Sequence, residues 1–332
     1  MDNHKRLTVK EISGLTGFSA STISRLVNHP ELVNEETRQK VYRSFTEHNI
    51  KLPELHKSEK KIIGLTFSNV SSLFTSTLIS SLETCLAATD YQLLLFNLGK
   101  RGNVYNFFSA HAEYLKKIDG LIISGAFLDE QGSLFFRNMD VPVVLLQSRC
   151  KTEQCICTNN FIGCRDAAKF MLAKGYRKIA FVKWSPADEH ILDRYMGFSS
   201  VLELAGYPMP KDYIVSAPLS SKGGYDATKQ LMSLENVPEA IFYGCDEMAA
   251  GGFRYMREHG IFVPDNVGIM GFDDLAISAL LGITTMNQFL GSKSEMAISY
   301  LLNRLSGKTG PDAAVDEISI TPKVLERTSL RK

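Results

Sequence analysis

Short apolar runs separated by helical stretches constrain the fold after residue 61 more strongly than any other feature of the sequence. Each run is almost wholly apolar, so neither of its faces is suited to water. The runs lie at 62–67, 91–97, 120–123, 141–146, 178–182, 240–243 and 267–270. About four strand–helix units precede residue 150 and about four follow it, which predicts an α/β protein with two doubly wound parallel-sheet lobes. Lobes of this kind bind ligands beyond the carboxyl ends of their strands.

The composition is that of a soluble globular protein. The chain has 332 residues, 44% hydrophobic and 22% charged, with 37 Lys+Arg against 36 Asp+Glu. This length predicts roughly two or three domains, and no apolar run approaches the ~20 residues of a membrane span. The N-terminus has no apolar segment of a secretory signal, and six cysteines make no disulfide framework. We therefore expect a cytoplasmic protein with reduced thiols.

The first sixty residues have a different pattern, of short helices without strands. A capping box at 8–11 begins the first helix, and Gly17 supplies a tight turn. Ser19 then caps a second helix over 20–27, and a third runs over about 34–47. Two short helices joined by a glycine turn predict a helix-turn-helix, whose second helix enters the major groove of DNA.

Catalytic and metal motifs find little support. Gly307 begins a Gly-Lys-Thr triplet, but Leu302 stands where a phosphate loop needs glycine. We find no nucleophile elbow and no His-Glu-x-x-His motif. Four cysteines cluster, but their spacing matches no common zinc site, which favours ordinary thiols over a redox or metal sensor. They are Cys150, Cys155, Cys157 and Cys164. No cofactor and no metal ion are expected.

Longer segments along nearly the whole chain resemble those of a known protein family. Segments 7–12, 17–28 and 35–38 resemble the DNA-binding headpiece of the lactose/galactose repressor family. Many later segments resemble its effector domain, which is similar to periplasmic sugar-binding proteins. These segments are 63–65, 118–123, 141–144, 175–181, 194–198, 263–265, 271–274, 284–288, 321–322 and 327–329.

The resemblance implies a division into domains. A DNA-binding domain at 1–52 and a short hinge at 53–61 would precede an effector-binding and dimerisation domain at 62–332. Its first lobe would comprise about 62–157 and 288–317, and its second about 158–287 and 318–332. The chain would cross between the lobes several times, and the effector would bind in the cleft.

The headpiece residues suit contacts with DNA. Ala20 and Ser21 begin the second helix, where small side chains reach base edges. Arg25 is the expected base reader, because a guanidinium fits guanine O6 and N7 bidentately. Six others suit phosphate contacts, which position the protein without reading sequence. These are Thr8, Ser19, Thr22, Ser24, Asn28 and Arg38, of which Thr8 and Ser19 also cap helices.

The hinge departs from the family pattern. Segment 53–61 reaches the first strand about five residues early compared with a typical member, whose hinge becomes helical on DNA. Leu55 is the one candidate for a minor-groove wedge. The alternative is a charged tether that makes no such contact.

In the body, Arg194 and Asp273 are the first candidates for effector contact. The resemblance places both in the cleft, where an Arg fork and a carboxylate suit vicinal sugar hydroxyls. Gln288 lies at a lobe crossover and is a weaker candidate. Phe74 could stack on a ligand or pack in the core, and Asp246 could face the cleft or cap a helix.

Two positions change the family's usual polar chemistry. Asn159, also an effector-binding candidate, stands where the family usually has Asp, and Cys245 where it usually has Asn. Trp184, the single tryptophan, follows a predicted strand and could line the cleft or pack beneath it.

These observations predict a homodimeric transcriptional repressor that binds a pseudo-palindromic operator and is not an enzyme. A small molecule, a sugar or sugar derivative, would shift the lobes and thereby operator affinity. A ligand sensor with a vestigial headpiece is the main alternative. An α/β enzyme is the other, although the sequence offers no nucleophile–base constellation for it.

Overall fold

The computed structural model describes residues 9–28, 33–47, 61–99, 103–308 and 316–331. The chain divides into two compact units, residues 1–60 and 61–332, which are considered separately. Most of the expected hinge at 53–61, including Leu55, lies outside the described residues. Within the described part, no helix has the length and apolar character needed to cross a membrane.

The first unit is a bundle of three short helices. They are α1 (Val9–Thr16), α2 (Ala20–Asn28) and α3 (Glu35–Glu47). Gly17 has φ of +73°, a conformation that favours glycine, and it turns the chain between α1 and α2. Each helix contributes at least one buried apolar side chain to the centre of the bundle. These side chains are Ile12, Ile23, Leu26 and Val41. The expected helix-turn-helix is confirmed.

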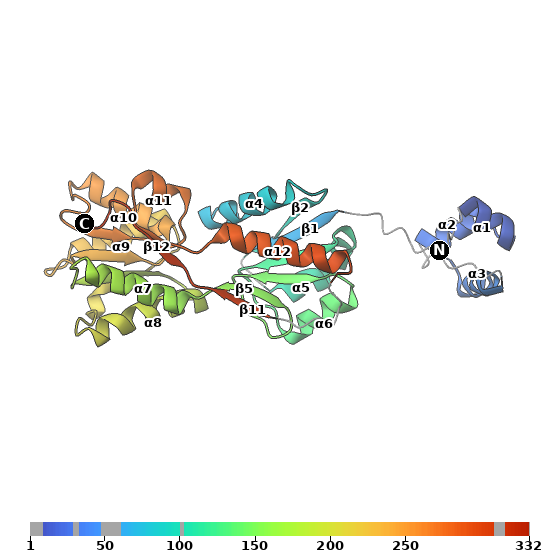
Figure 1. The fold of residues 1–332 in the computed structure, drawn as a ribbon, viewed down its shortest axis with the longest axis horizontal. Helices are drawn as coiled ribbons and strands as arrows, with labels where there is room; N and C mark the ends of the chain where they lie inside the picture. Colours follow the sequence, from blue (N-terminus) through green and yellow to red (C-terminus); the bar gives the residue numbers. More distant parts are fainter. Residues whose placement is uncertain (1–8, 29–32, 48–60, 100–102, 309–315, 332) are drawn as a thin grey trace. The chain divides into compact units, whose positions relative to one another are not determined.

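The second unit begins with a six-stranded parallel sheet of order β11-β5-β4-β3-β1-β2. Its strands are β1 (Ile62–Phe67), β2 (Gln92–Asn97), β3 (Gly120–Ser124), β4 (Val143–Leu146), β5 (Gln154–Thr158) and β11 (Glu317–Ile320). The helices beside it are α4 (Leu73–Leu86), α5 (Val104–Ala110), the 3-10 helix η3 (Ala112–Lys117), α6 (Glu130–Asn138) and α12 (Leu290–Leu305). We call this part lobe 1 (Figure 1).

Alternate residues of the lobe 1 strands enter two separate cores. Ile63 and Leu65 pack with Leu82 of α4. Leu121 and Ile123 pack on the other side, in the core that contains α5 and α6. Because neighbouring residues of a strand point to opposite faces, wholly apolar strands require helices on both faces.

Lobe 2 contains a four-stranded parallel sheet of order β7-β6-β8-β9. Its strands are β6 (Ile179–Trp184), β7 (Ile214–Ala217), β8 (Ala240–Tyr243) and β9 (Gly268–Met270). Its helices are α7 (Asn160–Ala173), α8 (Glu189–Leu204), the 3-10 helix η4 (Lys211–Tyr213), α9 (Ser221–Met232), α10 (Asp246–Glu258) and α11 (Ala276–Leu281). The α7–α8 pair and the α9–α10 pair lie on opposite sides of the sheet (Figure 1).

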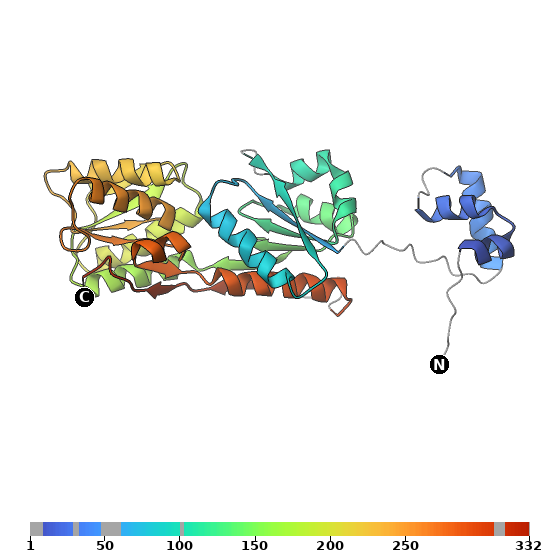
Figure 2. The ribbon, with the colours of Figure 1, turned by 90° about the horizontal axis from the view of Figure 1, so that it is seen from above.

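Three chain crossings join the two lobes. The chain passes from β5 into α7, from β10 (Thr285–Asn287) into α12, and from β11 into β12 (Lys323–Leu325). Strands β10 and β12 pair antiparallel, a small sheet that the sequence patterns did not predict. Figure 2 shows the C-terminal strands running from lobe 1 back to lobe 2. The predicted α/β class, a helical headpiece followed by two parallel-sheet lobes, is confirmed.

Candidate functional site

The first candidate site is the exposed start of α2 in the headpiece. The Ser19 hydroxyl accepts from the Thr22 backbone N–H at 3.0 Å, so it caps the helix as expected. It also lies 2.8 Å from the hydroxyls of both Ser21 and Thr22. This hydroxyl cluster at a helix N-terminus is suited to a phosphate oxygen, because the helix dipole favours negative charge there.

The outer face of α2 carries the expected base readers. Ala20, Ser21 and Arg25 are exposed, while Ile23 and Leu26 of the same helix are buried. Arg38 of α3 is half-buried. Thr8 and the side chains of Ser24 and Asn28 lie outside the described residues.

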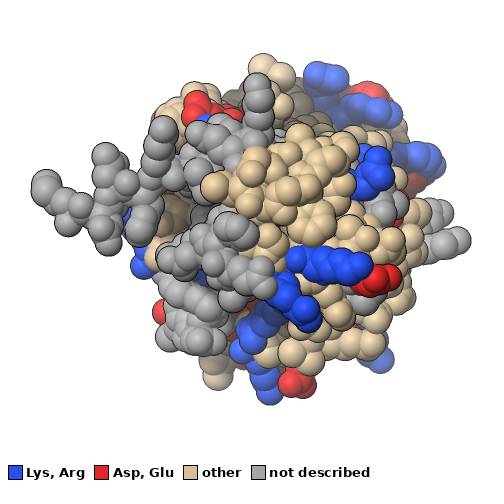
Figure 3. All heavy atoms as spheres, turned by 90° about the vertical axis from the view of Figure 1, so that its right-hand side faces the viewer, with Lys and Arg blue, Asp and Glu red and all other residues tan. Residues whose placement is uncertain are grey.

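The charge of the headpiece surface is modestly positive. Its described side chains with charge are the basic Arg25, Arg38, Lys40 and Arg43, and the acidic Glu36, which pairs with Lys40 at 2.7 Å. Figure 3 shows basic side chains beside neutral ones on the face that it draws. The described headpiece side chains thus carry more positive than negative charge, which favours contact with a phosphate backbone.

The second candidate site is a cavity of about 260 Å³ between the lobes. Lobe 1 contributes the residues after three strands: Phe67, Ser68, Asn69, Ser72, Phe74, Thr75, Ser124, Gly125 and Gln147. Lobe 2 contributes the residues after all four strands: Trp184, Asp188, His190, Arg194, Leu219, Cys245, Glu247, Asp273 and Leu275. Gln288 lines it from the β10–α12 crossover. The residues from the two lobes lie at or beyond the carboxyl ends of parallel strands, where such sheets bind ligands.

Arg194 and Asp273 form the charged centre of the cavity wall. Arg194 Nη1 lies 3.4 Å from Asp273 Oδ1 and 2.5 Å from the Gly244 carbonyl, and Nε donates to Asn160 Oδ1 at 2.9 Å. The guanidinium carbon lies 3.6 Å from the centroid of the Phe272 ring. Burial raises the pKa of the Asp273 carboxyl to about 6, although the Arg194 charge opposes this shift. The pair is therefore a fixed, desolvated unit that can meet ligand hydroxyls.

The backbone that carries Asp273 is strained. Asp273 and its neighbour Asp274 have φ of +122° and +59°, values that residues with side chains rarely adopt. Asp274 accepts from Arg327 Nη2 at 2.6 Å, and the Asp273 N–H donates to the Met286 carbonyl at 3.0 Å. Such strain persists only where surrounding contacts hold it, and it is frequent at ligand sites.

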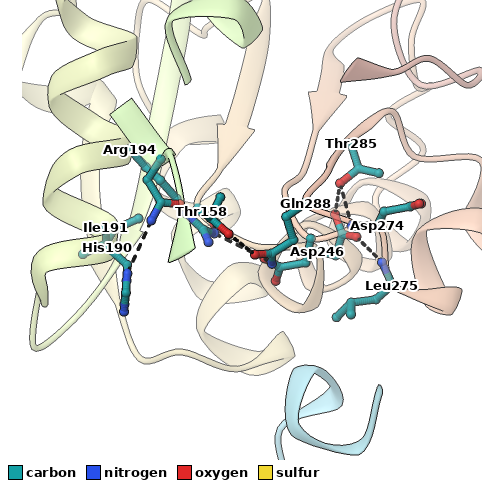
Figure 4. A network of polar contacts seen from close by, with 12 residues as sticks. Thr158, His190, Ile191, Arg194, Asp246, Asp274, Leu275, Thr285 and Gln288 are labelled. Atoms are coloured by element: carbon teal, nitrogen blue, oxygen red, sulfur yellow. Dashed lines mark hydrogen bonds and ion pairs between the residues drawn. The ribbon is translucent and has the colours of Figure 1, made fainter. Parts of the chain in front are cut away.

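Asp246 lies beneath this loop instead of lining the cavity. It is fully buried, and its two carboxylate oxygens accept from the Leu275 N–H at 2.8 Å and the Thr285 hydroxyl at 2.6 Å (Figure 4). Burial, and then the nearby Asp273 charge, raise the pKa of Asp246 to about 7. Gly271 is required next to it, because an added Cβ would lie 2.2 Å from Asp246 Oδ1. Asp246 thus positions the loop that bears Asp273.

Gln288 connects the crossover to both lobes. Its Nε2 donates to Asp273 at 2.8 Å, and its Oε1 accepts from Gln147 Nε2 at 2.7 Å. Thr158 and Lys293 complete the network, with Thr158 Oγ1 and Lys293 Nζ at 2.9 and 3.1 Å from Gln288 Oε1. Lys293 is fully buried, and burial lowers its pKa to about 7.

His190 supplies a further polar group on α8. Asn160 Nδ2 lies 3.4 Å from His190 Nδ1, and since Asn160 Oδ1 accepts from Arg194, this nitrogen is the donor. Burial lowers the pKa of His190, so the ring is neutral at neutral pH and its proton is on Nε2. His190 can therefore donate one hydrogen bond but brings no charge.

Glu247 and Arg149 make further polar contacts between the lobes. The Leu73 N–H at the start of α4 in lobe 1 donates to Glu247 Oε2 of lobe 2 at 3.4 Å. Arg149 of lobe 1 lies 3.0 Å from Glu189 Oε1 of lobe 2 and 3.2 Å from Glu317 Oε1 of lobe 1. These contacts depend on the spacing of the lobes and would change if the lobes moved.

The structure brings four of the six candidate effector residues to one cavity: Phe74, Arg194, Asp273 and Gln288. Asp246 and Asn159 are not among its lining residues. Asn159 caps α7, because its side-chain oxygen accepts from the Ile162 N–H at 3.1 Å. Trp184 lines the cavity, as does Cys245.

Asp188, His190 and Glu247 also line the cavity, and none of them was predicted from the sequence. Each lies shortly after the end of a strand that was predicted, β6 or β8. Polar residues just beyond the carboxyl ends of parallel strands are the signal that could have found them.

Comparison with known proteins gives matches for both units. Residues 8–50 match the family described as bacterial regulatory proteins, lacI family, and residues 168–330 match the periplasmic binding protein-like domain. The chain is similar to the repressor PurR of Klebsiella pneumoniae, with 25% identity over 97% of this chain and 96% of the relative. The PurR of Photorhabdus laumondii is 27% identical, with the same shares covered.

Solved structures show the same fold. The complex of the transcriptional regulator CelR with cellobiose has a TM-score of 0.69 at 20% identity, covering 98% of this chain and 100% of that one. A LacI family regulator from Enterococcus faecium with bound ribose has a TM-score of 0.71 at 22% identity, covering 81% and 98%.

Proposed function

The chain belongs to the LacI family of bacterial regulatory proteins, and we propose that it is a cytoplasmic repressor whose affinity for a pseudo-palindromic operator is controlled by a small molecule. One observation carries the proposal. A single chain joins a helix-turn-helix with Ser21 and Arg25 exposed on its second helix to a two-lobed body with a polar cavity between the lobes.

The proposed mechanism is linkage between the cavity and the headpieces of a homodimer. An effector that binds one arrangement of the lobes more tightly shifts the population toward it, and the spacing of the two headpieces changes with the lobes. Two headpieces are needed because one makes too small an interface for high specificity. The cellobiose and ribose complexes of structural relatives support a sugar or sugar derivative as effector.

The proposed contacts follow the placement of the residues. Ala20, Ser21 and Arg25 would meet base edges, with Ser19, Thr22 and Arg38 on phosphates. In the cavity, the Arg194–Asp273 pair would bind hydroxyls while Phe74 and Trp184 cover an apolar face of the ligand. We also propose that the ligand is released unchanged, since the family consists of regulators rather than enzymes.

The first test is selection of random duplex DNA by the full-length protein at about 0.15 M salt. An enriched palindrome is the expected result, because a symmetric dimer reads two half-sites in opposite orientation. Salt-sensitive binding without any sequence preference would instead favour a sensor with a vestigial headpiece.

Replacing Arg25 by alanine is expected to relax the operator preference at one base position in each half-site. The loss of a bidentate contact to guanine should reduce discrimination there by about 1–3 kcal/mol, measured by competition binding with point-substituted operators. Arg43→Ala on α3 is the matched control, and it should leave base preference unchanged. Equal operator preference in the Arg25 variant and the wild type would remove Arg25 from the base contacts.

A further inference from the structure

We propose, on the basis of the proposed function, that the effector is an uncharged polyhydroxylated molecule and that Glu247 and Asp188 exclude phosphorylated or carboxylated ligands of the same size. Among the described residues that line the cavity, the charged groups are the carboxylates Asp188, Glu247 and Asp273 and the single guanidinium of Arg194.

The guanidinium is already neutralised. Arg194 contacts Asp273, and two further protein oxygens accept from it, those of Gly244 and Asn160. Aromatic rings lie on it as well, with Phe272 and Trp184 centroids 3.6 and 5.4 Å from the guanidinium carbon. Only a part of the group is left for a ligand. A hydroxyl can accept one N–H there, but a phosphate would meet the Asp273 carboxylate beside it.

Glu247 occupies the second positive feature, the N-terminus of α4. The N-cap residue Ser72 makes no side-chain capping bond, and no acidic residue lies in the first turn of α4. The Glu247 carboxylate reaches this helix end from the opposite lobe, 3.4 Å from the Leu73 nitrogen. It supplies the negative charge that a helix N-terminus favours, at the place where an anionic ligand would otherwise bind.

Asp188 does the same for α8. Its side chain accepts from the Ile191 N–H at 3.1 Å, and Glu189 adds an acidic residue in the first turn. His190 is neutral, as argued above, and Lys293 is fully buried behind Gln288 without lining the cavity. The Arg194 guanidinium and the N-termini of α4 and α8 thus each already face a carboxylate in the described wall. An anionic ligand would be repelled by these carboxylates and would have no unpaired positive charge to bind.

The same groups suit a neutral polyol. Carboxylate oxygens are strong acceptors for hydroxyl protons, and Ser68, Asn69 and Ser124 add short polar side chains on the lobe 1 side. A hydroxyl that bonds Glu247 while its neighbour bonds lobe 1 would also hold the lobes together. We therefore expect Glu247 to hold the two lobes together when the ligand is uncharged and not when it carries negative charge.

The test uses the emission of Trp184, the single tryptophan of the chain, which lines the cavity. Full-length protein is titrated with matched pairs: ribose and ribose 5-phosphate, glucose and glucose 6-phosphate, galactose and galactose 6-phosphate, and also with inorganic phosphate. At least one neutral sugar should give a saturable change, with a Kd about tenfold or more below that of its phosphate ester. Inorganic phosphate should give none.

Substitutions at Glu247 test whether this carboxylate causes the preference for the neutral sugar. Glu247→Gln should bring the two Kd values of a matched pair several-fold closer, and Glu247→Lys should reverse the preference. Glu203→Gln, at an exposed position of α8 that does not line the cavity, should change neither Kd. Unchanged discrimination in Glu247→Gln would overturn the role assigned to this residue.

Tighter binding of a phosphate ester than of its parent sugar would overturn this inference and leave the proposed function standing. The absence of a saturable response to any sugar or ester, together with an enriched operator, would also overturn it, because the ligand class would be wrong while DNA binding remained. Failure of operator selection would count against the proposed function itself.

Discussion

Replacement of Arg194 by methionine is expected to lower the free energy of unfolding of residues 61–332 by about 3–5 kcal/mol at pH 7.5. Methionine keeps much of the buried volume and leaves the Asp273 carboxylate without its positive partner, in a site where its side chain is only 7% exposed. The Gly244 carbonyl and Asn160 Oδ1 lose their donor at the same time. Urea denaturation followed by far-ultraviolet circular dichroism measures the change.

The pH dependence of the lost free energy of unfolding shows whether it comes from the unpaired Asp273 carboxylate or only from lost packing around residue 194. Without Arg194, the pKa of Asp273 should rise above its already raised value of about 6, so the folded variant holds a proton that the unfolded chain releases. A group with a raised folded-state pKa contributes stability that is lost as pH rises through that pKa. The deficit of the variant should therefore shrink from pH 7.5 to pH 5.

Arg257→Met provides the matched control, because Arg257 is an exposed residue in the last turn of α10 in the same lobe. It should change the free energy of unfolding by less than about 0.5 kcal/mol. A deficit of Arg194→Met that is the same at pH 5 and pH 7.5 would show that Asp273 is not left as an uncompensated charge.

The apolar runs predicted the α/β class and seven of the parallel strands, but no predicted run covers β5, β7 or β11. Almost wholly apolar segments such as 62–67 and 240–243 are typical of interior strands of a sheet with helices on both faces, and β1 and β8 are such strands. Glycine and a hydroxyl cap, at Gly17 and Ser19, similarly mark the turn of the headpiece. The β10–β12 pair was missed because its segments, Thr-Met-Asn and Lys-Val-Leu, form no apolar run.

The roles of individual polar residues were harder to predict, because the same side chain suits more than one role. Asn159 lies between β5 and α7, and Asp246 is the first residue of α10. At both positions an oxygen can bind a ligand or a backbone N–H with similar chemistry. Only the fold decides, and it gives Asn159 the Ile162 N–H and Asp246 the Leu275 N–H. The contact of Glu247 with the opposite lobe could not be predicted, because its partner Leu73 is 174 residues away in sequence.

Lys293 is the strongest case of a role that sequence hides. It stands in the segment Gly-Ser-Lys-Ser-Glu, which is typical of the exposed start of a helix. The crossover at Gln288 nevertheless covers it, and Lys293 is fully buried with Nζ 2.5 Å from Thr158 Oγ1. A tertiary crossover, which no local pattern encodes, has buried a residue type that is rarely found inside.

Lys293→Met is expected to remove a rise in stability with pH that the wild-type protein shows above neutrality. Burial lowers the pKa of Lys293 to about 7 in the folded protein, whereas the unfolded chain keeps the ordinary value near 10.5. Between these values the unfolded chain binds one more proton, so the free energy of unfolding rises with pH. From pH 7 to pH 9.5, the wild type should gain about 3 kcal/mol relative to the variant.

The hydrogen bonds around Lys293 explain why methionine is the informative substitution. Gln288 Oε1 still accepts from Gln147 Nε2 at 2.7 Å and from the Thr158 hydroxyl at 2.9 Å when the ammonium group is gone. Thr158 Oγ1 loses Lys293 as its donor but still donates its own proton, so each of these groups keeps a hydrogen-bond partner. The titrations of Asp246 and Asp273 are present in both proteins and largely cancel in the difference. Lys222→Met, at a side chain that is 82% exposed, should give a profile parallel to the wild type. If the Lys293→Met profile is parallel as well, Lys293 is charged in the folded protein, and the Gln288 crossover then covers an ammonium ion instead of a neutral amine.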